Sequence, residues 1–188
     1  MSRYIPLPFN YDSDAMLHIL KPFKKTSVTS CDNNIKLEIY KLLGITFPIT
    51  TILYFQLEPL ANGHIHIDKN LSNPNAFNTD FALDIPLHNG TNVLMRWYED
   101  NTPDCQSDIF TGVSGTDTPL LSKNRAVCID KLYYTAPHIV KINNWHSVEN
   151  QSNDEYSRFI SLRFYVPLEK VLNYFLVRGT GIEPVLIA

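Results

Sequence analysis

Two histidines and an aspartate in the stretch GHIHID, residues 63–68, are residues whose types and spacing could support chemistry. Side chains of a β-strand alternate between its two faces, so His64, His66 and Asp68 would share one face. Imidazole and carboxylate groups are costly to bury without partners, and both are common metal ligands. The stretch therefore predicts a metal site, or else a polar strand at the edge of a sheet.

Residues further along the chain could complete such a site. His146 lies at the start of another expected strand, and the strand that follows carries Arg158 and Arg163. Two histidines and one carboxylate bound to one face of a metal leave its other face open, which is the ligand set of non-haem Fe(II) oxygenases. We therefore predict His66, Asp68 and His146 as metal ligands. Arg158 and Arg163 are five residues apart and point to opposite faces of their strand, so only one can line the site.

Four more residues are candidates for a substrate pocket. Asp84 alternates with apolar residues in FALDIPLH, so it needs a partner or a ligand if its face lines the interior, and none if its face meets solvent. His88 ends that run and could lie at the mouth of the pocket. Arg96 could contact an anionic substrate if it faces inward, and Trp97 could form part of the core or of the rim.

The elements that must position these residues are expected to be mainly strands. Runs rich in β-branched and aromatic residues, separated by turn-rich pieces, predict strands at 50–59, 63–68, 81–88, 92–99, 125–134, 138–145 and 157–166. A Ser/Asp cap and Pro22 delimit a helix over 13–23. The stretch 33–44 has helical spacing and ends at Gly44, although its composition also allows a strand. A closing helix is possible after Pro167.

This order of elements predicts a single domain over residues 1–188. It would comprise a helical N-terminal part (1–49), a β core (50–167) and a C-terminal tail (168–188). We expect a mainly β (α+β) fold in which N-terminal helices pack on a double-stranded β-helix, or jelly roll.

Charge and composition narrow the classes of partner. The net charge is −3 and no basic stripe is present, so we expect no nucleic-acid binding. No stretch approaches the length of a membrane span, and the start lacks the apolar run of a signal peptide. Cys31, Cys105 and Cys128 are odd in number and show no CxxC spacing, so we expect free thiols and a cytoplasmic location.

The ordered set His66-x-Asp68, His146 and a following arginine resembles the Fe(II)/2-oxoglutarate-dependent oxygenases over roughly residues 50–167. FALDIPLHNG and WHSVENQSNDEYSRFISLRFYV are most similar to the aspartyl/asparaginyl β-hydroxylase branch. The resemblance implies that the three ligands bind Fe(II). It also implies that Arg158, or failing that Arg163, binds the distal carboxylate of 2-oxoglutarate, and that the protein hydroxylates a small molecule or peptide.

The sequence departs from that family in two places. The strand after the His-x-Asp loop lacks the arginines usual in that branch, and Arg158 lies 12 residues after His146, where the usual gap is about ten. The alternative is a non-catalytic, cupin-like module that binds a metal or a small molecule. A cupin would carry a glutamate about four residues after its histidine pair, and KNLSNP has none.

Overall fold

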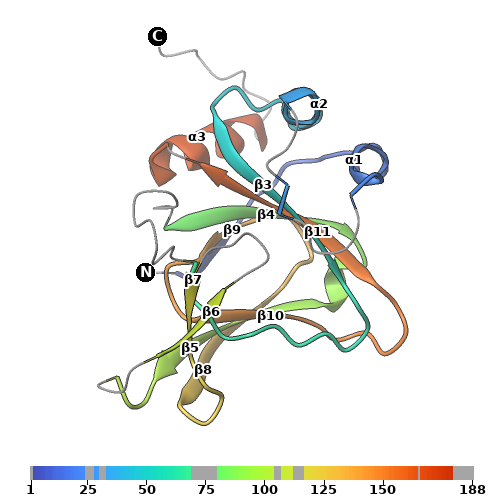
Figure 1. Cartoon of the computed structure of the whole chain (residues 1–188). Coiled ribbons are helices and arrows are strands. Elements are labelled where there is room, and N and C mark those ends of the chain that lie inside the picture. The colour runs from blue at the N-terminus through green and yellow to red at the C-terminus, as the bar shows by residue number, and fades with distance from the viewer. Residues whose placement is uncertain are drawn as a thin grey trace.

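Two antiparallel sheets face each other, and three helices cover the outer face of the larger sheet (Figure 1). The computed structural model describes residues 2–23, 28–29, 33–68, 80–103, 107–111, 117–164 and 166–179. Its helices are α1 (Ser13–Leu20), α2 (Asn33–Leu43) and α3 (Leu168–Gly179), with a 3₁₀ turn η1 (Gly90–Asn92). Its strands are β1 (Tyr4–Pro6), β2 (Val28–Thr29), β3 (Ile49–Leu57), β4 (Phe81–His88), β5 (Val93–Asp100), β6 (Asp108–Thr111), β7 (Asp117–Leu120), β8 (Ala126–Tyr133), β9 (His138–Lys141), β10 (His146–Asn150) and β11 (Ser157–Phe164).

The strands pair in a nested order. The large sheet runs β1-β9-β4-β11-β3-β2, the small sheet runs β10-β5-β8, and β6 and β7 form a separate hairpin. β5 pairs with β8, β4 with β9, and β3 with β11, while bridges at Asn62 and His66 join the segment 62–66 to β10. Each segment thus pairs with its counterpart from the other half of the chain. This nesting brings residues 62–68 beside His146 although they are far apart in sequence.

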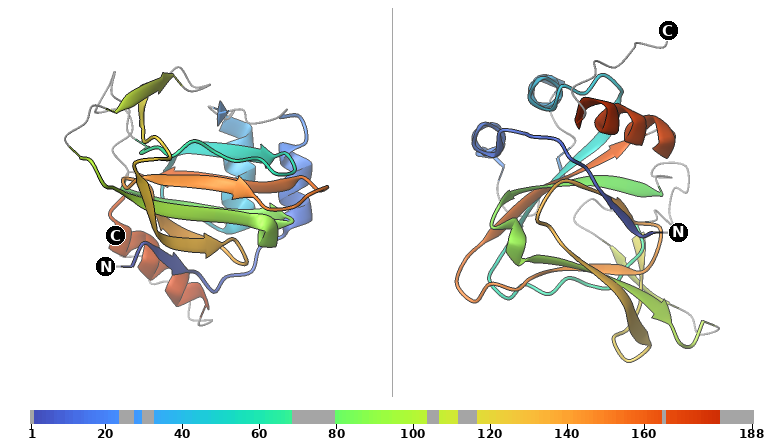
Figure 2. Two further views of the ribbon diagram at one scale, coloured as in Figure 1. Left: turned by 90° about the horizontal axis from the view of Figure 1, so that it is seen from below. Right: turned by 180° about the vertical axis from the view of Figure 1, so that it is seen from behind.

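Two apolar cores lie on the two faces of the large sheet. The outer core joins the sheet to the helices and includes Met16, Ile39, Leu162 and Phe175. The inner core lies between the sheets and includes Trp97. Figure 2 shows the helices on one side of the large sheet and the small sheet on the other. Strand alternation therefore assigns successive residues of β11 to different environments.

Local signals account for the helix ends. The Asp12 side chain accepts a hydrogen bond from the Ala15 amide at 2.9 Å and caps α1. After α2, Gly44 takes a φ of 59°, in the left-handed region that glycine enters without steric cost. The Ile45 amide then bonds back to the Tyr40 carbonyl at 3.0 Å, a pattern common at helix ends. The stretch 33–44, which also allowed a strand, is therefore a helix.

Three sequence expectations differ in detail from the fold. Residues 63–68 do not form a regular strand, because four steps from Asn62 to His66 face only three from Glu149 to His146. The N-terminal part contributes β1 and β2 to the large sheet as well as two helices. The expected C-terminal tail begins with α3, and residues 180–188 lie outside the described part of the chain. The expectation of a mainly β fold with helices is confirmed.

The described helices include none that is both long and apolar enough to cross a membrane. Cys128 is exposed and forms no disulfide, whereas Cys31 and Cys105 lie outside the described residues.

Candidate metal centre

His66, Asp68 and His146 come together at one end of the space between the sheets. The Asp68 Oδ1 atom lies 3.1 Å from His66 Nε2 and 4.0 Å from His146 Nε2. One ligand atom from each residue falls within 4.8 Å of the other two. Ligand atoms at right angles around a metal, with bonds of about 2.1 Å, lie about 3 Å apart. The His66–Asp68 separation already meets that requirement, so the donor set fits a metal ion.

Backbone pairing holds the two histidines side by side. The amides of His66 and His146 each donate to the other residue's carbonyl at 2.9 Å, and their ring centroids lie 4.5 Å apart. Gly63 lets the segment approach β10, because a Cβ atom there would lie 2.6 Å from the Val148 carbonyl oxygen. The Asp68 amide donates to the Ile142 carbonyl at 3.1 Å. The three ligands are therefore positioned by main-chain contacts from different parts of the chain.

The second nitrogen of each imidazole is also held. His66 Nδ1 lies 2.9 Å from the His64 carbonyl oxygen, and His146 Nδ1 lies 2.8 Å from the Asn144 carbonyl oxygen. A carbonyl only accepts hydrogen bonds, so each Nδ1 carries a proton. The Nε2 lone pair of His146 is then free, whereas His66 Nε2 donates to the Asp68 carboxylate and must give up that proton to bind a metal. Histidine ligands are typically oriented in this way. Both Nε2 atoms are therefore oriented towards a common position that a metal could occupy.

A chain of buried polar side chains leads away from Asp68. Arg163 Nη2 donates to Asp68 Oδ2 at 2.6 Å, and Arg163 Nη1 donates to the Ser161 hydroxyl. Ser161 donates to one carboxylate oxygen of Asp84, and the Tyr134 hydroxyl donates to the other. Asp84 is buried on the inner face of β4. Of the two alternatives for this residue, the face that lines the interior is therefore the correct one. The partners of Asp84 are these two hydroxyls.

The surroundings favour the ligand forms of Asp68 and His146. Burial alone would raise the pKa of Asp68, but the Arg163 guanidinium and the hydrogen bond from His66 outweigh it and hold that pKa well below its usual range. Burial, with a contribution from neighbouring His66, lowers the pKa of His146 to about 4. Near neutral pH Asp68 is therefore ionised and His146 is neutral, as metal binding requires.

The pKa values of His66 and Asp84 are raised, whereas those of Asp68 and His146 are lowered. Burial would lower the pKa of His66, but without a metal its hydrogen bond to the Asp68 carboxylate raises that pKa overall. Burial raises the pKa of Asp84, although Arg163 and the two hydroxyl groups oppose that shift. The pKa of Tyr134 is well above its usual range, because the residue is buried and contacts Asp84. Tyr134 is therefore a neutral hydrogen-bond donor.

The two candidate arginines occupy different faces of β11. Arg158 Nε donates to Gln56 Oε1 at 3.0 Å, and its charge acts on Tyr54 of the outer core. Arg158 therefore points away from the metal centre, and the expectation that it lines the site is corrected by strand parity. Arg163, the fallback, is the arginine that the structure brings to Asp68.

Of the other three pocket candidates, His88 and Arg96 lie away from the candidate metal centre, and Trp97 belongs to the core. His88 is exposed at the far end of β4, where its Nε2 lies 3.0 Å from Asn89 Nδ2. Arg96 forms a 3.2 Å ion pair with Glu149 and alternates with the inward-facing Met95 and Trp97, so it lies on the outer face of the small sheet. Trp97 is fully buried, and its indole donates to the Lys141 carbonyl at 2.8 Å. Trp97 is therefore a core residue beside the site.

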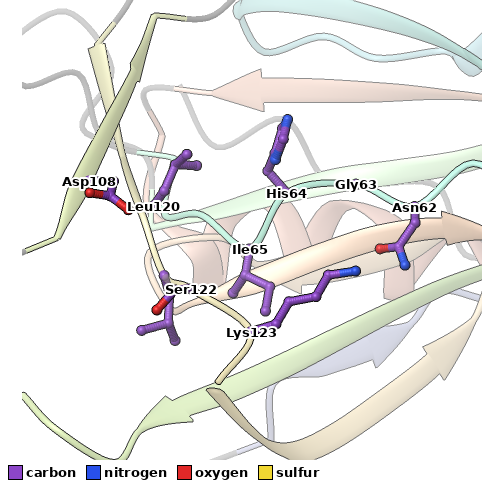
Figure 3. A pocket seen from close by; sticks show the side chains of 9 residues that line it. Asn62, Gly63, His64, Ile65, Asp108, Leu120, Ser122 and Lys123 are labelled. Carbon is purple, nitrogen blue, oxygen red and sulfur yellow. The ribbon is translucent and has the colours of Figure 1, made fainter. Parts of the chain in front are cut away.

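A pocket of about 300 Å³ lies between the segment 62–65 and the β6–β7 hairpin, and its lining residues include none of the three candidate ligands. In Figure 3 the Ile65 and Lys123 side chains point to one side of the segment and His64 to the other. Asp108, at the start of β6, lies on the wall of the pocket that the β6–β7 hairpin forms. His64 is exposed, and its ring lies 5.1 Å from that of Phe110. His64 thus supplies its carbonyl to His66 and is not part of the ligand cluster.

Sequence reasoning missed Ser161 and Tyr134 as parts of the site. Ser161 could have been found by parity, since it alternates with Ile160 and Leu162 and shares the face of Arg163. No comparable signal marks Tyr134, because it reaches Asp84 from just beyond the end of β8.

Comparison with known proteins adds no assignment. No family model matches the sequence, and a search of curated proteins gave no significant match.

Proposed function

We propose that the protein is an Fe(II)- and 2-oxoglutarate-dependent oxygenase that hydroxylates a small-molecule or peptide substrate. The observation that carries the proposal is the convergence of His66 Nε2, His146 Nε2 and Asp68 Oδ1, with a buried arginine on the remaining oxygen of Asp68. Two neutral imidazoles and one carboxylate suit Fe(II) and leave coordination positions for other ligands.

Exposure of the ligands supports binding of a further molecule at the metal. The side chain of His146 is 4% exposed, whereas those of His66 and Asp68 are 30% and 26% exposed. The cluster is thus closed on the side of the small sheet and open beside the segment 66–68. A structural metal site is usually closed by four protein ligands. When bound, Fe(II) and 2-oxoglutarate together supply the dioxygen chemistry that hydroxylates a C–H bond.

The strand order supports a jelly roll. From β3 to β11 eight segments, including 62–66, divide between the two sheets, and they pair first with last and so on inward. That is the arrangement of a long hairpin folded over into two sheets of four. His66 and His146 come from the small-sheet side and Asp68 contacts Arg163 of the large sheet, so the cluster lies between the two sheets.

Arg163 is the residue we propose to bind the distal carboxylate of 2-oxoglutarate. A guanidinium has five N–H donors, and Arg163 uses one on Asp68 and one on Ser161. The remaining donors can bind a carboxylate with the planar geometry that arginine favours. Arg158 cannot take this role without leaving Gln56 and crossing the large sheet.

The pocket in Figure 3 favours a small substrate. Its volume of about 300 Å³ is at the lower end of the range for small-molecule sites. Ile65 and Leu121 provide buried apolar surface, and Lys123 and Asp108 place opposite charges on its walls. The pocket adjoins the segment that carries His66 through the backbones of Ile65 and Leu120, although none of the three candidate ligands lines it.

The second candidate is a non-catalytic module that binds a metal or small molecule in the same fold. The observation that favours it is the ion pair between Arg163 and Asp68, which already engages the arginine needed for the cosubstrate.

Anaerobic titration with Fe(II) and 2-oxoglutarate tests the proposal. We expect wild type to develop the visible metal-to-ligand charge-transfer band and to convert 2-oxoglutarate to succinate in air. His146→Ala should lose both, because it removes a ligand, and His18→Ala, which changes an exposed histidine of α1, should keep both. Metal binding without the band or succinate would favour the non-catalytic module. Absence of metal binding by wild type would contradict the oxygenase and leave only a module that binds a small molecule without a metal.

A further inference from the structure

The two oxygens of Asp68 have different partners. Oδ1 faces the two imidazoles, at 3.1 Å from His66 Nε2 and 4.0 Å from His146 Nε2. Oδ2 accepts a hydrogen bond from Arg163 Nη2 at 2.6 Å. An Oδ2 atom engaged in this way is not available as a second metal bond. Whatever holds Arg163 in place therefore decides that the carboxylate binds through one oxygen.

On the side away from Asp68, Arg163 is held by hydrogen bonds in which the donor and the acceptor can be assigned. Arginine nitrogens only donate, so the Ser161 hydroxyl accepts from Arg163 Nη1. The single hydroxyl proton of Ser161 is then donated to Asp84 Oδ1. Asp84 Oδ2 accepts from Tyr134, whose hydroxyl also lies 3.3 Å from Met95 Sδ. Asp84 is the acceptor at the end of this chain, and its carboxyl group interacts electrostatically with the guanidinium.

Because its members are buried, this chain of hydrogen bonds fixes one end of the guanidinium firmly. Asp84 is 4% exposed, Ser161 2% and Arg163 6%, so water competes little for their hydrogen bonds. A buried guanidinium must be paired, and within the described part of the chain this one donates to Asp68 and Ser161. Removing the Ser161–Asp84 side would leave Arg163 fixed at one end only.

We infer that Asp84 is a positioning residue of the metal centre, which acts through Ser161 to hold Arg163 against Asp68 Oδ2 and so keeps the carboxylate a one-oxygen ligand. The inference rests on the proposed metal site but requires neither 2-oxoglutarate nor turnover. Its consequence is an open coordination position that a two-oxygen aspartate would occupy. Asp84 touches neither the metal ligands nor, by this inference, the substrate.

Binding of Co(II) without oxygen or cosubstrate tests the inference. Ser161→Ala breaks the chain, and Asp84→Asn removes the terminal charge at nearly constant volume. We expect each to weaken Co(II) binding by about tenfold or more, the usual effect of losing a partner of a metal ligand. We also expect the visible Co(II) spectrum to change, because its shape and intensity report the number of ligands.

Ser157→Ala is the matched control. Ser157 lies on the same face of β11, is buried, and has its hydroxyl bonded to Asn89 and Asn150, away from the metal centre. This variant should lose comparable stability while keeping the wild-type Co(II) affinity and spectrum. Equal losses of affinity in Ser157→Ala and Ser161→Ala would indicate general loosening and overturn the inference. So would a wild-type affinity and spectrum in both Ser161→Ala and Asp84→Asn.

Failure of the proposed function is distinguishable from failure of this inference. Bound Co(II) without 2-oxoglutarate turnover leaves the inference standing and removes the oxygenase. If wild type binds no Co(II), the metal site is contradicted, and crystal structures of wild type and Ser161→Ala decide the matter. Retention of the Arg163–Asp68 contact in that variant would overturn the inference, and its loss would support the positioning of Asp68 by Asp84.

Discussion

Each face of β11 carries one arginine, and the two arginines have different partners. On the outer face Arg158 bonds to Gln56 at the edge of a core built from Ile160, Leu162 and the helices. On the inner face Arg163 is buried and joins Asp68 to Ser161. The difference is one of parity, because an odd number of steps along a strand reverses the face. The outer face contributes stability, and the inner face contributes the polar chain that ends at the metal centre.

This division has a physical reason. The large sheet is covered by helices on one side and by the small sheet on the other, so both faces exclude water (Figures 1 and 2). A polar group on either face must bring its own partners. The outer face avoids the problem with apolar side chains, whereas the inner face solves it by linking Asp84, Ser161 and Arg163.

The largest expected effect separates stability from metal binding. Leu162→Ala on the outer face should lower the free energy of unfolding by about 2–5 kcal/mol, because Leu162 is fully buried and the change leaves a cavity. Co(II) affinity should stay near the wild-type value. Chemical denaturation and metal titration measure the two quantities. A large loss of affinity in Leu162→Ala would show that the faces are not separable.

The pH dependence of stability should come from His66 and His146, which belong to the candidate metal centre and lie outside β11. With metal removed by chelator, the free energy of unfolding should fall as the pH drops from about 6.5 towards 4. In this window the unfolded chain protonates His146 whereas the folded chain, with a pKa of about 4, does not. A shift of this size corresponds to about 3 kcal/mol at most. Above pH 6.5 stability should decline again, because the folded state keeps a proton on His66.

Substitution of His146 tests whether this residue causes the loss of stability at acid pH. His146→Gln cannot protonate in this range, so its stability should be flatter below pH 6.5, as measured by denaturation at a series of pH values. Arg158→Gln on the outer face should keep the wild-type profile. An unchanged acid limb in His146→Gln would mean that another group binds the proton.

The third effect compares the two arginines directly. Arg163→Gln should weaken Co(II) binding by about 10–100-fold, because it frees Asp68 Oδ2 and removes its charged partner. It should also weaken 2-oxoglutarate binding if the proposed function holds. Arg158→Gln should change neither, since its guanidinium bonds to Gln56 on the other face. Calorimetric titration of both variants measures the contrast. The reverse order of effects would assign the site to Arg158 and overturn the parity found here.

The sequence was sufficient for the helices and most of the longer strands, but not for the short strands β1, β2, β6 and β7 or for how the elements pair. Strand runs such as 81–88 and the caps of α1 and α2 are local signals, and they were predicted close to their observed bounds. The grouping of His66, Asp68 and His146 was also predicted, because imidazole and carboxylate side chains are costly to bury without partners. Their meeting depends on nested pairing over long range, which composition does not reveal but a resemblance did suggest.

Two features could not be predicted for physical reasons. Parity showed that Arg158 and Arg163 face opposite sides, but both faces of β11 are buried, so hydrophobic alternation does not identify the inner one. The irregular path of residues 62–66 arises from an unequal register with β10 and from the close approach at Gly63. Such bulges depend on the partner strand and leave no pattern in the segment itself.

The smallest expected effect lies at the far end of the polar chain. Tyr134→Phe removes the hydroxyl that donates to Asp84 but leaves Ser161 bonded to the same carboxylate. The loss should be about 1 kcal/mol of unfolding free energy, with a change in Co(II) affinity of only a few fold. Denaturation and Co(II) titration beside Ser161→Ala measure the ratio. A loss of affinity as large as that of Ser161→Ala would mean that Tyr134 fixes Asp84. The anchor of the metal centre would then extend from β4 to the end of β8.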